Sequence, residues 1–278
     1  GGMSRYIFIG LVWLAALSAA SAAGYDAYRH GLAERNRGDV KLALAKFTAA
    51  LNAGDLNPEL VPVAHVNRGK ALLYNGACAD AADDFTAVLK LKPNDMESLG
   101  WRSSAYVCLQ KFDQAIADEN LVMAAQPGAP AFRRRGQIFW LKGDFAAAAS
   151  DFEQATKLDP KYTYGWLWLD VVRVRAGTAD PSQMRHDLQN LDLDAWPLPA
   201  FSLFMGQTKP EDVIASAGRG DPDEAKGNEC EANFYVAEWW LAQHMPKNAQ
   251  PLLEQAASSC PRDFVERGLA VGELKHLQ

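Results

Sequence analysis

Four cysteines are the residues whose spacing in this 278-residue sequence most directly suggests covalent chemistry. Cys78, Cys108, Cys230 and Cys260 form no C-x-x-C motif, and no two of them are closer than 30 residues. This wide spacing argues against a zinc site. An even number of cysteines in a secreted chain is typical of disulfides. We therefore expect two disulfides and no bound metal.

The other reactive side chains form no catalytic pattern. Five histidines are scattered along the chain, and none belongs to an H-E-x-x-H motif or accompanies a serine or cysteine nucleophile. The sequence has no G-x-G-x-x-G and no phosphate-binding loop. Arg219-Gly220-Asp221 matches an integrin-type tripeptide, but such a match is expected by chance in a turn rich in Gly, Asp and Pro. We expect a protein that is not an enzyme and uses no cofactor.

Composition narrows the class of partner. The chain has 28 basic and 34 acidic side chains and a formal net charge of −6, and 49% of its residues are apolar. The acidic balance argues against a nucleic-acid binder, which concentrates positive charge. The apolar share is enough for a continuous core.

The N-terminal segment has the pattern of a secretory signal peptide. Two glycines (residues 1–2) resemble a cloning remnant, so Met3 is the expected natural start. Arg5 precedes an apolar run over residues 6–17, and Ala20-Ser21-Ala22 fits an A-x-A cleavage site. The run is shorter than the roughly 20 residues that cross a bilayer. No cysteine follows closely, so a lipid anchor at an N-terminal cysteine is excluded.

We therefore expect residues 3–22 to be removed and the mature chain to be secreted, most simply into a bacterial periplasm. Retention of residues 6–23 as an inner-membrane anchor is the alternative.

An internal repeat in the sequence predicts the helices that position the side chains of the chain. Segments that begin at Pro62, Met96, Ala129 and Thr163 are spaced by 34, 33 and 34 residues. A further segment begins at Gly24, and its extra length is assigned to a loop over residues 55–58. A small residue recurs at the eighth and twentieth positions of the segments and a phenylalanine at the twenty-fourth. The eighth positions are Gly31, Gly69, Ser103 and Gly136, the twentieth are Ala43, Ala81, Ala115 and Ala148, and the twenty-fourth are Phe47, Phe85 and Phe152.

These positions predict pairs of antiparallel helices. The small residues allow the two helices to approach, and the phenylalanines are expected to fill the space between successive pairs. Glycine marks the turn inside a pair, because a positive φ costs glycine little, and proline ends the second helix. The turn glycines are Gly38, Gly76, Gly143 and Gly177, and the prolines are Pro93, Pro127 and Pro160.

Charged residues also recur in register, with arginine at the seventh position and aspartate at the twenty-third. The pairs are Arg68 with Asp84, Arg102 with Asp118, and Arg135 with Asp151. We expect each arginine to pair with the aspartate of its own repeat. As exposed ion pairs they would contribute about 0–1 kcal/mol each.

The period and the recurring residues resemble the tetratricopeptide repeat family. The resemblance implies an all-α, right-handed superhelix of helix pairs. The expected organisation is repeat 1 over 23–57, repeat 2 over 62–95, repeat 3 over 96–128, repeat 4 over 129–162, a degenerate repeat 5 over 163–191, an irregular helical segment over 192–229, a repeat-like unit 6 over 230–262 and a capping helix over 263–278. In this register Cys78–Cys108 and Cys230–Cys260 are the favoured disulfides of the three possible connectivities.

The C-terminal third also resembles the end of the NlpI-type bacterial envelope lipoproteins. The residues that carry this likeness are Asn233-Phe234-Tyr235, Trp240-Leu241, Leu252-Leu253, Ala256, Phe264-Val265-Glu266 and Glu273-Leu274. That family docks proteases and cell-wall hydrolases on a helical-repeat surface. This chain lacks the lipidated cysteine of the family, so outer-membrane anchoring is not implied.

In tetratricopeptide stacks the first helix of each repeat lines a concave face, and this implies a peptide-binding surface. The residues expected on it are Tyr28, Arg35, Lys70, Tyr74, Arg133, Arg134, Gln137, Trp140, Tyr164, Leu167 and Arg175. Aromatic rings beside arginine suit an extended or helical peptide anchored by a carboxylate. The alternative is that Trp140, Trp168 and Tyr164 pack between neighbouring repeats or against residues 196–205.

The sequence therefore predicts an exported adaptor or scaffold for envelope proteins, with protein or peptide partners and no nucleic acid. Homodimerisation through the unit around Trp239 and Trp240 is plausible. One alternative is a subunit of a membrane-associated complex held by a retained N-terminal helix. Another is an enzyme or small-ligand carrier in which residues 192–229 close a pocket.

Overall fold

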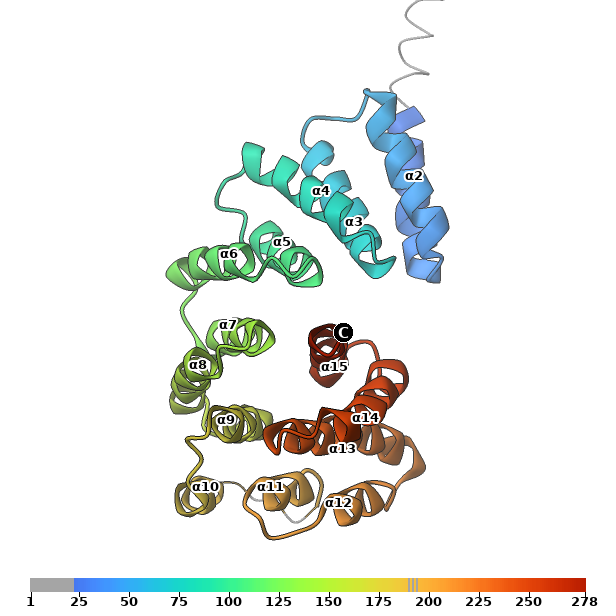
Figure 1. Cartoon of the computed structure of the whole chain (residues 1–278). Helices are drawn as coiled ribbons and strands as arrows, with labels where there is room; N and C mark the ends of the chain where they lie inside the picture. Colours follow the sequence, from blue (N-terminus) through green and yellow to red (C-terminus); the bar gives the residue numbers. More distant parts are fainter. Residues whose placement is uncertain (1–22, 190, 192, 194) are drawn as a thin grey trace, which may run out of the picture. The chain divides into compact units, whose positions relative to one another are not determined.

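The regular structure of the chain is α-helical wherever the structure describes it. The computed structural model describes residues 23–189, 191, 193 and 195–278 (Figure 1). The predicted signal segment, residues 3–22, lies outside the described residues. Residues 23–37 are helical. They are followed by α2 (Val40–Ala53), α3 (Leu60–Tyr74), α4 (Cys78–Leu91), α5 (Met96–Cys108), α6 (Phe112–Ala125), α7 (Ala129–Lys142), α8 (Phe145–Leu158), α9 (Thr163–Ala176), α10 (Pro181–Leu188), α11 (Leu198–Phe204), α12 (Pro210–Ala217), α13 (Pro222–Ala242), α14 (Pro246–Ser259) and α15 (Val265–His276).

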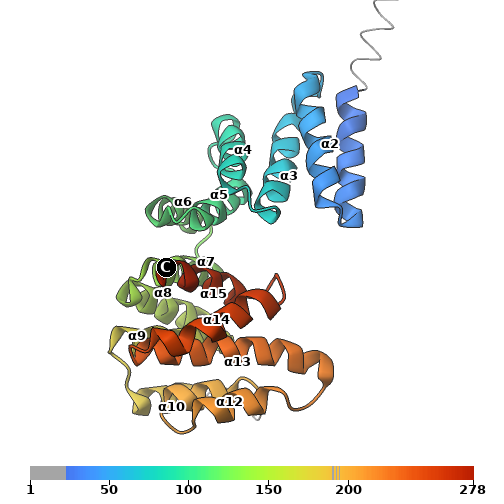
Figure 2. The ribbon, with the colours of Figure 1, turned by 45° about the vertical axis from the view of Figure 1, so that its right-hand side comes forward.

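The helices divide into two compact units, unit 1 over Gly1–Ala125 and unit 2 over Gln126–Gln278. In unit 1, α3 pairs with α4 and α5 with α6. In unit 2, α7 pairs with α8, α8 packs on α9, and the long α13 packs on both α9 and α14 (Figure 2). The predicted all-α fold built from helix pairs is confirmed. None of the described helices has the length and apolar character needed to cross a bilayer.

Local sequence signals start and stop these helices. The side chains of Asp39, Asp95 and Asp144 each accept a hydrogen bond from a backbone N–H in the first turn of α2, α5 and α8. Such N-caps satisfy donors that have no partner inside the helix. Gly143 and Gly177 end α7 and α9 with φ values of 82° and 71°, as predicted for the turn positions.

The phenylalanine at the twenty-fourth position packs on the small residue of its own repeat. A Cβ added to Gly69 would lie 2.8 Å from the ring of Phe85, and one added to Gly136 would lie 2.8 Å from the ring of Phe152. Both rings are fully buried. The ring therefore lies inside a helix pair, directly against the glycine. It also meets the next pair, as expected, because the ring centroids of Phe152 and Trp168 on α9 are 6.0 Å apart.

Two glycine substitutions in unit 1 test this contact. We expect Gly69→Ala to lower the free energy of unfolding by roughly 1–3 kcal/mol, because the new methyl overlaps the buried Phe85 ring. Gly100→Ala is the matched control, since no atom lies within 4 Å of its added Cβ and its helical φ suits alanine. Urea unfolding should show that Gly100→Ala leaves the free energy of unfolding unchanged or raises it by about 0.5–1 kcal/mol. Equal effects of the two changes would contradict the packing.

The predicted arginine–aspartate pairs are confirmed, but they are more buried than expected. In each pair the guanidinium donates two hydrogen bonds to the carboxylate: at 2.8 and 2.7 Å from Arg68 to Asp84, and at 2.8 and 2.7 Å from Arg135 to Asp151. The side chains of Asp84 and Asp151 are 4% and 5% exposed. Burial raises the pKa of Asp84, but hydrogen bonds from Arg68 and His65 outweigh it and hold that pKa below its ordinary value. A buried carboxylate makes the loss of its arginine costly, unlike the loss of an exposed pair.

The cysteines pair as predicted. The Cα atoms of Cys78 and Cys108 are 6.2 Å apart, and those of Cys230 and Cys260 are 5.1 Å apart. The first disulfide joins the start of α4 to the end of α5 in unit 1. The second joins α13 to the residue that follows α14 in unit 2. Each disulfide therefore fixes helices within one unit.

The predicted irregular helical segment over residues 192–229 contains short helices, as expected, but its C-terminal boundary differs. It contains α11, α12 and the first turns of α13. Helix α13 begins at Pro222, so the boundary that we placed before Cys230 falls inside a helix. Val213, Ala217 and Leu203 from this segment pack with Ala232 and Val236 of α13 in one buried cluster. The segment therefore forms part of the core of unit 2.

Candidate functional site

The inner face of the repeats in unit 2 is covered by the C-terminal helices of the chain. Helix α15 contacts α7, and α13 contacts α9 (Figure 1). Trp140 on α7 and Leu167 on α9 are fully buried, and Trp168 is 2% exposed. In unit 2, the helix faces that would line a peptide groove are therefore covered by other helices of the same chain.

Helix α15 binds this face through two buried carboxylates. The indole Nε1 of Trp140 donates to Glu273 at 3.0 Å, and that of Trp168 donates to Glu266 at 3.2 Å. Glu266 and Glu273 are 3% and 2% exposed. The two glutamates are seven residues apart, so they lie two helical turns apart on the same side of α15.

Helix α13 repeats this arrangement on α9. The hydroxyl of Tyr164 donates to Glu231 at 2.7 Å, and Arg175 forms an ion pair with the fully buried Glu238. Glu231 and Glu238 are again seven residues apart. The guanidinium of Arg175 also lies 4.5 Å from the ring centroid of Phe145. Each predicted groove position on α9 that carries a polar group thus has a glutamate partner from α13.

These contacts correct the predicted binding surface in unit 2. Trp140, Tyr164, Leu167 and Arg175 do not line an open groove, because the apolar and carboxylate side chains of α13 and α15 cover them. The alternative of internal packing holds for Trp140 and Tyr164. In sequence terms, the one available signal is that α13 and α15 each carry two glutamates seven residues apart, and this signal does not show which face they cover.

The other predicted residues of α7 lie nearer the surface. Arg133 forms an ion pair with Asp159 at 3.1 Å, and its guanidinium lies 4.1 Å from the ring centroid of Tyr162. Gln137 is half-buried, and Arg134 is exposed. These residues border the covered face without forming a continuous surface with Trp140.

Burial shapes the electrostatics of unit 2. Burial and the neighbouring carboxylate of Glu266 raise the pKa of Glu231 to about 7. Burial and Glu273 raise the pKa of Glu238 above its ordinary value. Burial also raises the pKa of Asp170 to about 8. These carboxyl groups bind protons more tightly in the folded chain than in the unfolded chain.

The raised pKa values predict a chain that is more stable at pH 5.5 than at pH 8. When the pKa of a carboxyl group is higher in the folded chain than in the unfolded chain, the group stabilises the fold fully only at pH values below the unfolded-state pKa. This stabilisation is lost as the pH rises through the folded-state pKa. His276, whose pKa is also raised, acts in the same direction. Glu273, whose pKa is lowered, loses its contribution only below the ordinary carboxyl range.

Urea unfolding at the two pH values checks this, with Asp170→Asn as the test variant. We expect the variant to remove roughly 1–3 kcal/mol of the difference, because Asp170 then no longer titrates. A pH dependence that is unchanged in Asp170→Asn would contradict the assignment.

Unit 1 keeps an exposed face on its first-helix positions. Trp101 on α5 is 38% exposed and Tyr74 on α3 is 58% exposed. The ammonium of Lys70 lies 5.1 Å from the ring centroid of Trp101 and forms an ion pair with Glu97. Arg35 is exposed and donates to Asn67 at 2.7 Å. We call these four residues, Arg35, Lys70, Tyr74 and Trp101, the open face of unit 1.

Two residues of unit 1 were misjudged from sequence. Tyr28 was predicted on the binding surface, but it is 8% exposed and packs against Phe47 at 6.0 Å between ring centroids. Trp101 was missed, although it occupies the sixth position of its repeat, the position that Arg134 and Trp168 occupy in the next two. That equivalence is the sequence signal that could have found it.

Unit 2 also contains a cavity of about 610 Å³. Its lining comes from α9, the segment over residues 195–199, the α12–α13 region and Phe264, and it includes Tyr164, Trp196 and Glu231. Within the described part of the chain, no three His, Cys, Asp or Glu side chains gather in a group that could hold a metal ion. The cavity combines aromatic walls with one buried carboxylate.

Comparisons with known proteins identify the repeats. Family models described as tetratricopeptide repeat match residues 66–130 and 129–162. The mitochondrial import receptor subunit TOM34 of Rattus norvegicus is 32% identical over 103 residues, which is 37% of this chain and 32% of that protein. The chain thus spans about a third of the length of this relative.

Solved structures share the fold. A tetratricopeptide repeat protein from Parabacteroides merdae matches with a TM-score of 0.59 and 18% identity, over 90% of this chain and 98% of that one. MamA from Desulfovibrio magneticus RS-1 matches with a TM-score of 0.52 and 19% identity, over 60% of this chain and 91% of that one. The narrower resemblance to NlpI-type lipoproteins is not confirmed.

The two family models cover the repeats in which the sequence pattern is most regular, and the solved structures extend the likeness to most of the chain. Tetratricopeptide repeats typically serve as non-enzymatic scaffolds for protein–protein interaction. Residues 66–162 of the chain therefore form tetratricopeptide repeats, and the chain as a whole shares the fold of tetratricopeptide repeat proteins.

Proposed function

We propose that the chain is an exported interaction scaffold that binds a peptide segment of a partner protein on the open face of unit 1. The observation that carries this proposal is the exposure of Trp101 and Tyr74 beside Lys70 and Arg35. In unit 2 the corresponding first-helix positions are covered by α13 and α15. The open face therefore supplies the aromatic and basic side chains that binding hot spots favour.

The chemistry of the open face favours a peptide that combines an apolar side chain with a carboxylate. The rings of Trp101 and Tyr74 offer apolar contact area. Lys70 is held by Glu97 in an ion pair whose two side chains are 33% and 57% exposed. Exposed pairs contribute only about 0–1 kcal/mol, so an incoming carboxylate could replace Glu97 at little cost.

Export to an oxidising compartment, most simply a bacterial periplasm, is part of the same proposal. The two cysteine pairs support it, because disulfides persist mainly outside the reducing cytosol. The signal-like pattern of residues 3–22 also supports it. The mass of the chain purified from its native source tests this directly. A mature start near Ala23 with both disulfides intact is expected, whereas full-length chain in the membrane fraction would favour the anchored-subunit alternative.

Selection of peptides from a random displayed library tests the binding face. We expect the selected peptides to be rich in aromatic and acidic residues. Their affinity for the Trp101→Ala variant should be about tenfold or more lower than their affinity for the native chain. Leu121→Ala, a change of an exposed apolar residue on α6, is the matched control and should leave the affinity unchanged. Equal binding to the native chain, Trp101→Ala and Lys70→Glu would rule out the open face.

A further inference from the structure

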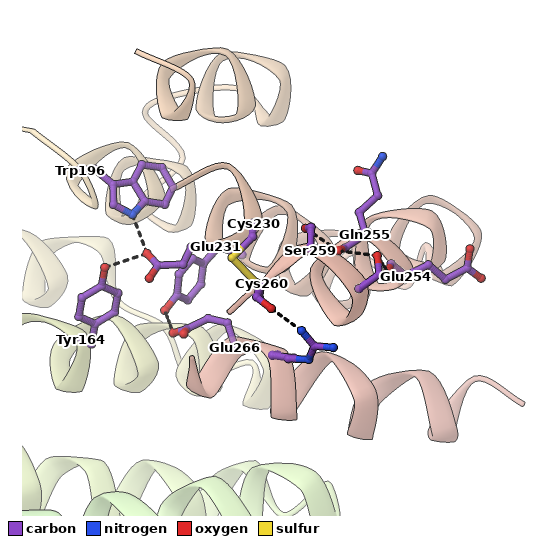
Figure 3. Close-up of a disulfide and its surroundings, with 12 residues drawn as sticks. Tyr164, Trp196, Cys230, Glu231, Glu254, Gln255, Ser259, Cys260 and Glu266 are labelled. Carbon is purple, nitrogen blue, oxygen red and sulfur yellow. Dashed lines mark hydrogen bonds between the residues drawn. A yellow bond between two sulfur atoms is a disulfide. The ribbon is translucent and has the colours of Figure 1, made fainter. Parts of the chain in front are cut away.

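The cavity in unit 2 is lined by a buried carboxylate, and among the described residues only one of its two oxygens accepts hydrogen bonds. Glu231 is 6% exposed and lines the cavity. Its Oε2 accepts hydrogen bonds from the Tyr164 hydroxyl and the Trp196 indole Nε1, both at 2.7 Å (Figure 3). Its Oε1 accepts none from the described residues. This oxygen is not among the fully enclosed unpaired atoms, so it is open to the cavity and available to a donor that the described residues do not provide.

The charge around this cavity is predominantly negative. Asp223 and Glu224 line it together with Glu231, and Arg219 is the cation in the lining. The nearby carboxylate of Glu266 adds to the negative potential, because it raises the pKa of Glu231. At the N-terminus of α13, Asp221 accepts a hydrogen bond from the Asp223 N–H, and Asp223 and Glu224 lie in the first turn, so these acidic side chains counter the positive end of the helix. An anionic ligand is therefore disfavoured.

The walls favour a cation that is also partly apolar. The rings of Tyr164, Trp196 and Phe264 border the cavity, with Leu198 and Pro199 beside them. Aromatic faces attract ammonium and guanidinium groups and pack well against their apolar stems. A volume of about 610 Å³ falls in the range of small-molecule sites and exceeds what one ammonium group would fill. Burial and Glu266 raise the pKa of Glu231 to about 7, which marks its charged form as lacking a counter-charge.

We propose that this cavity is a binding site for an organic cation, in which an ammonium or guanidinium group donates to Oε1 of Glu231 and an apolar part contacts Trp196 and Phe264. The same chemistry could come from a free amine or from a lysine or arginine side chain of a partner protein. The site lies within unit 2 and does not depend on the open face of unit 1. A failure of the cation-binding test would therefore leave the proposed peptide binding by unit 1 unaffected.

Calorimetric titration of the full chain with three isosteric probes tests this site. Benzamidine carries an aromatic ring and a cationic amidinium, benzamide is its neutral counterpart, and benzoate is anionic. We expect benzamidine to bind at least about tenfold more tightly than benzamide and benzoate to show no binding. Binding of benzoate as tight as that of benzamidine, or no binding of benzamidine at all, would overturn the proposal.

Glu231→Gln separates this site from binding elsewhere on the chain. The amide oxygen can still accept from Tyr164 and Trp196, but the negative charge is lost. We expect benzamidine affinity to fall about tenfold or more, while Glu254→Gln, the same change on the exposed side of α14, leaves it unaltered. If near-UV circular dichroism shows that Glu231→Gln does not fold, Glu224→Lys at the exposed rim of the cavity replaces it as the test variant. Its added positive charge should weaken the binding of benzamidine. Unchanged affinity in the folded variant that is tested would overturn the proposal.

A final comparison identifies the source of the cation. Acetyl-arginine amide and a hexapeptide with one central arginine are titrated under the same conditions. Tighter binding of the hexapeptide by about tenfold, still dependent on Glu231, supports a side chain of a partner protein. Equal affinity with the same dependence supports a free amine. Binding of both probes without dependence on Glu231 would overturn the site.

Discussion

Trp140→Ala should lower the free energy of unfolding of the chain by about 3–5 kcal/mol, the range for truncating a buried aromatic residue. Trp140 is fully buried, and its ring centroid lies 6.4 Å from that of Phe152 and 5.8 Å from that of Phe234. The substitution also removes the indole donor of the buried Glu273. Both the cavity and the lost hydrogen bond act against the packing of α7 on α13 and α15.

Urea unfolding followed by circular dichroism measures this effect, and Trp101→Ala is the control. Trp101 is 38% exposed and belongs to the open face of unit 1, so its truncation should change stability by no more than about 1 kcal/mol. The two tryptophans therefore have opposite expected roles, one in folding and one in binding. A Trp140→Ala chain with native stability would show that the inner face of α7 is not covered.

Replacing Cys230 and Cys260 together by alanine should lower the free energy of unfolding by about 2–5 kcal/mol, the usual cost of removing a native disulfide. Both cysteines are 1% exposed. Their bond ties α13 to the end of α14 (Figure 3). The helix that carries Glu266 and Glu273 follows a few residues later. Loss of the bond should therefore loosen α14 and α15 first.

Hydrogen exchange followed by mass spectrometry locates this loosening. We expect faster exchange of amides in α13–α15 in the Cys230→Ala, Cys260→Ala chain. The matched control is Cys78→Ala with Cys108→Ala, which should speed exchange in α4 and α5 of unit 1 instead. Faster exchange at the same amides in both chains would contradict the assignment of each disulfide to its own unit.

The repeats were predictable because their signals are local. The contact between Gly69 and Phe85, and the pairing of Arg68 with Asp84, each lie within one period of the sequence. The disulfide pairs followed from the same register. The residues that form these contacts therefore recur at fixed spacings, and one sequence is enough to show them.

The covering of unit 2 was not predictable in this way, because its contacts join distant parts of the chain. The hydrogen bond from Trp140 to Glu273 spans 133 residues, and that from Trp168 to Glu266 spans 98. A repeat register places Trp140 on the inner face but does not show what covers that face. The glutamate partners carry no periodic relation to the repeats.

In the segment over residues 192–229 the predicted short helices are present, but the helix that was expected to begin at Cys230 begins at Pro222. Pro210 and Pro222 occupy the first turns of α12 and α13. Proline suits this position, since its missing N–H would have no partner there and its φ is already helical. The same residue type that ends the second helix of each repeat begins helices in this segment.

Hydroxyl-radical footprinting of the native chain tests the central claim, that the inner face of the repeats is closed in unit 2 and open in unit 1. The measurement compares the oxidation rates of individual tryptophans by mass spectrometry. Trp101 should be oxidised readily, whereas Trp140 and Trp168 should be protected until the chain unfolds. Oxidation of Trp140 as fast as that of Trp101 in the folded chain would show that α13 and α15 do not cover the repeats.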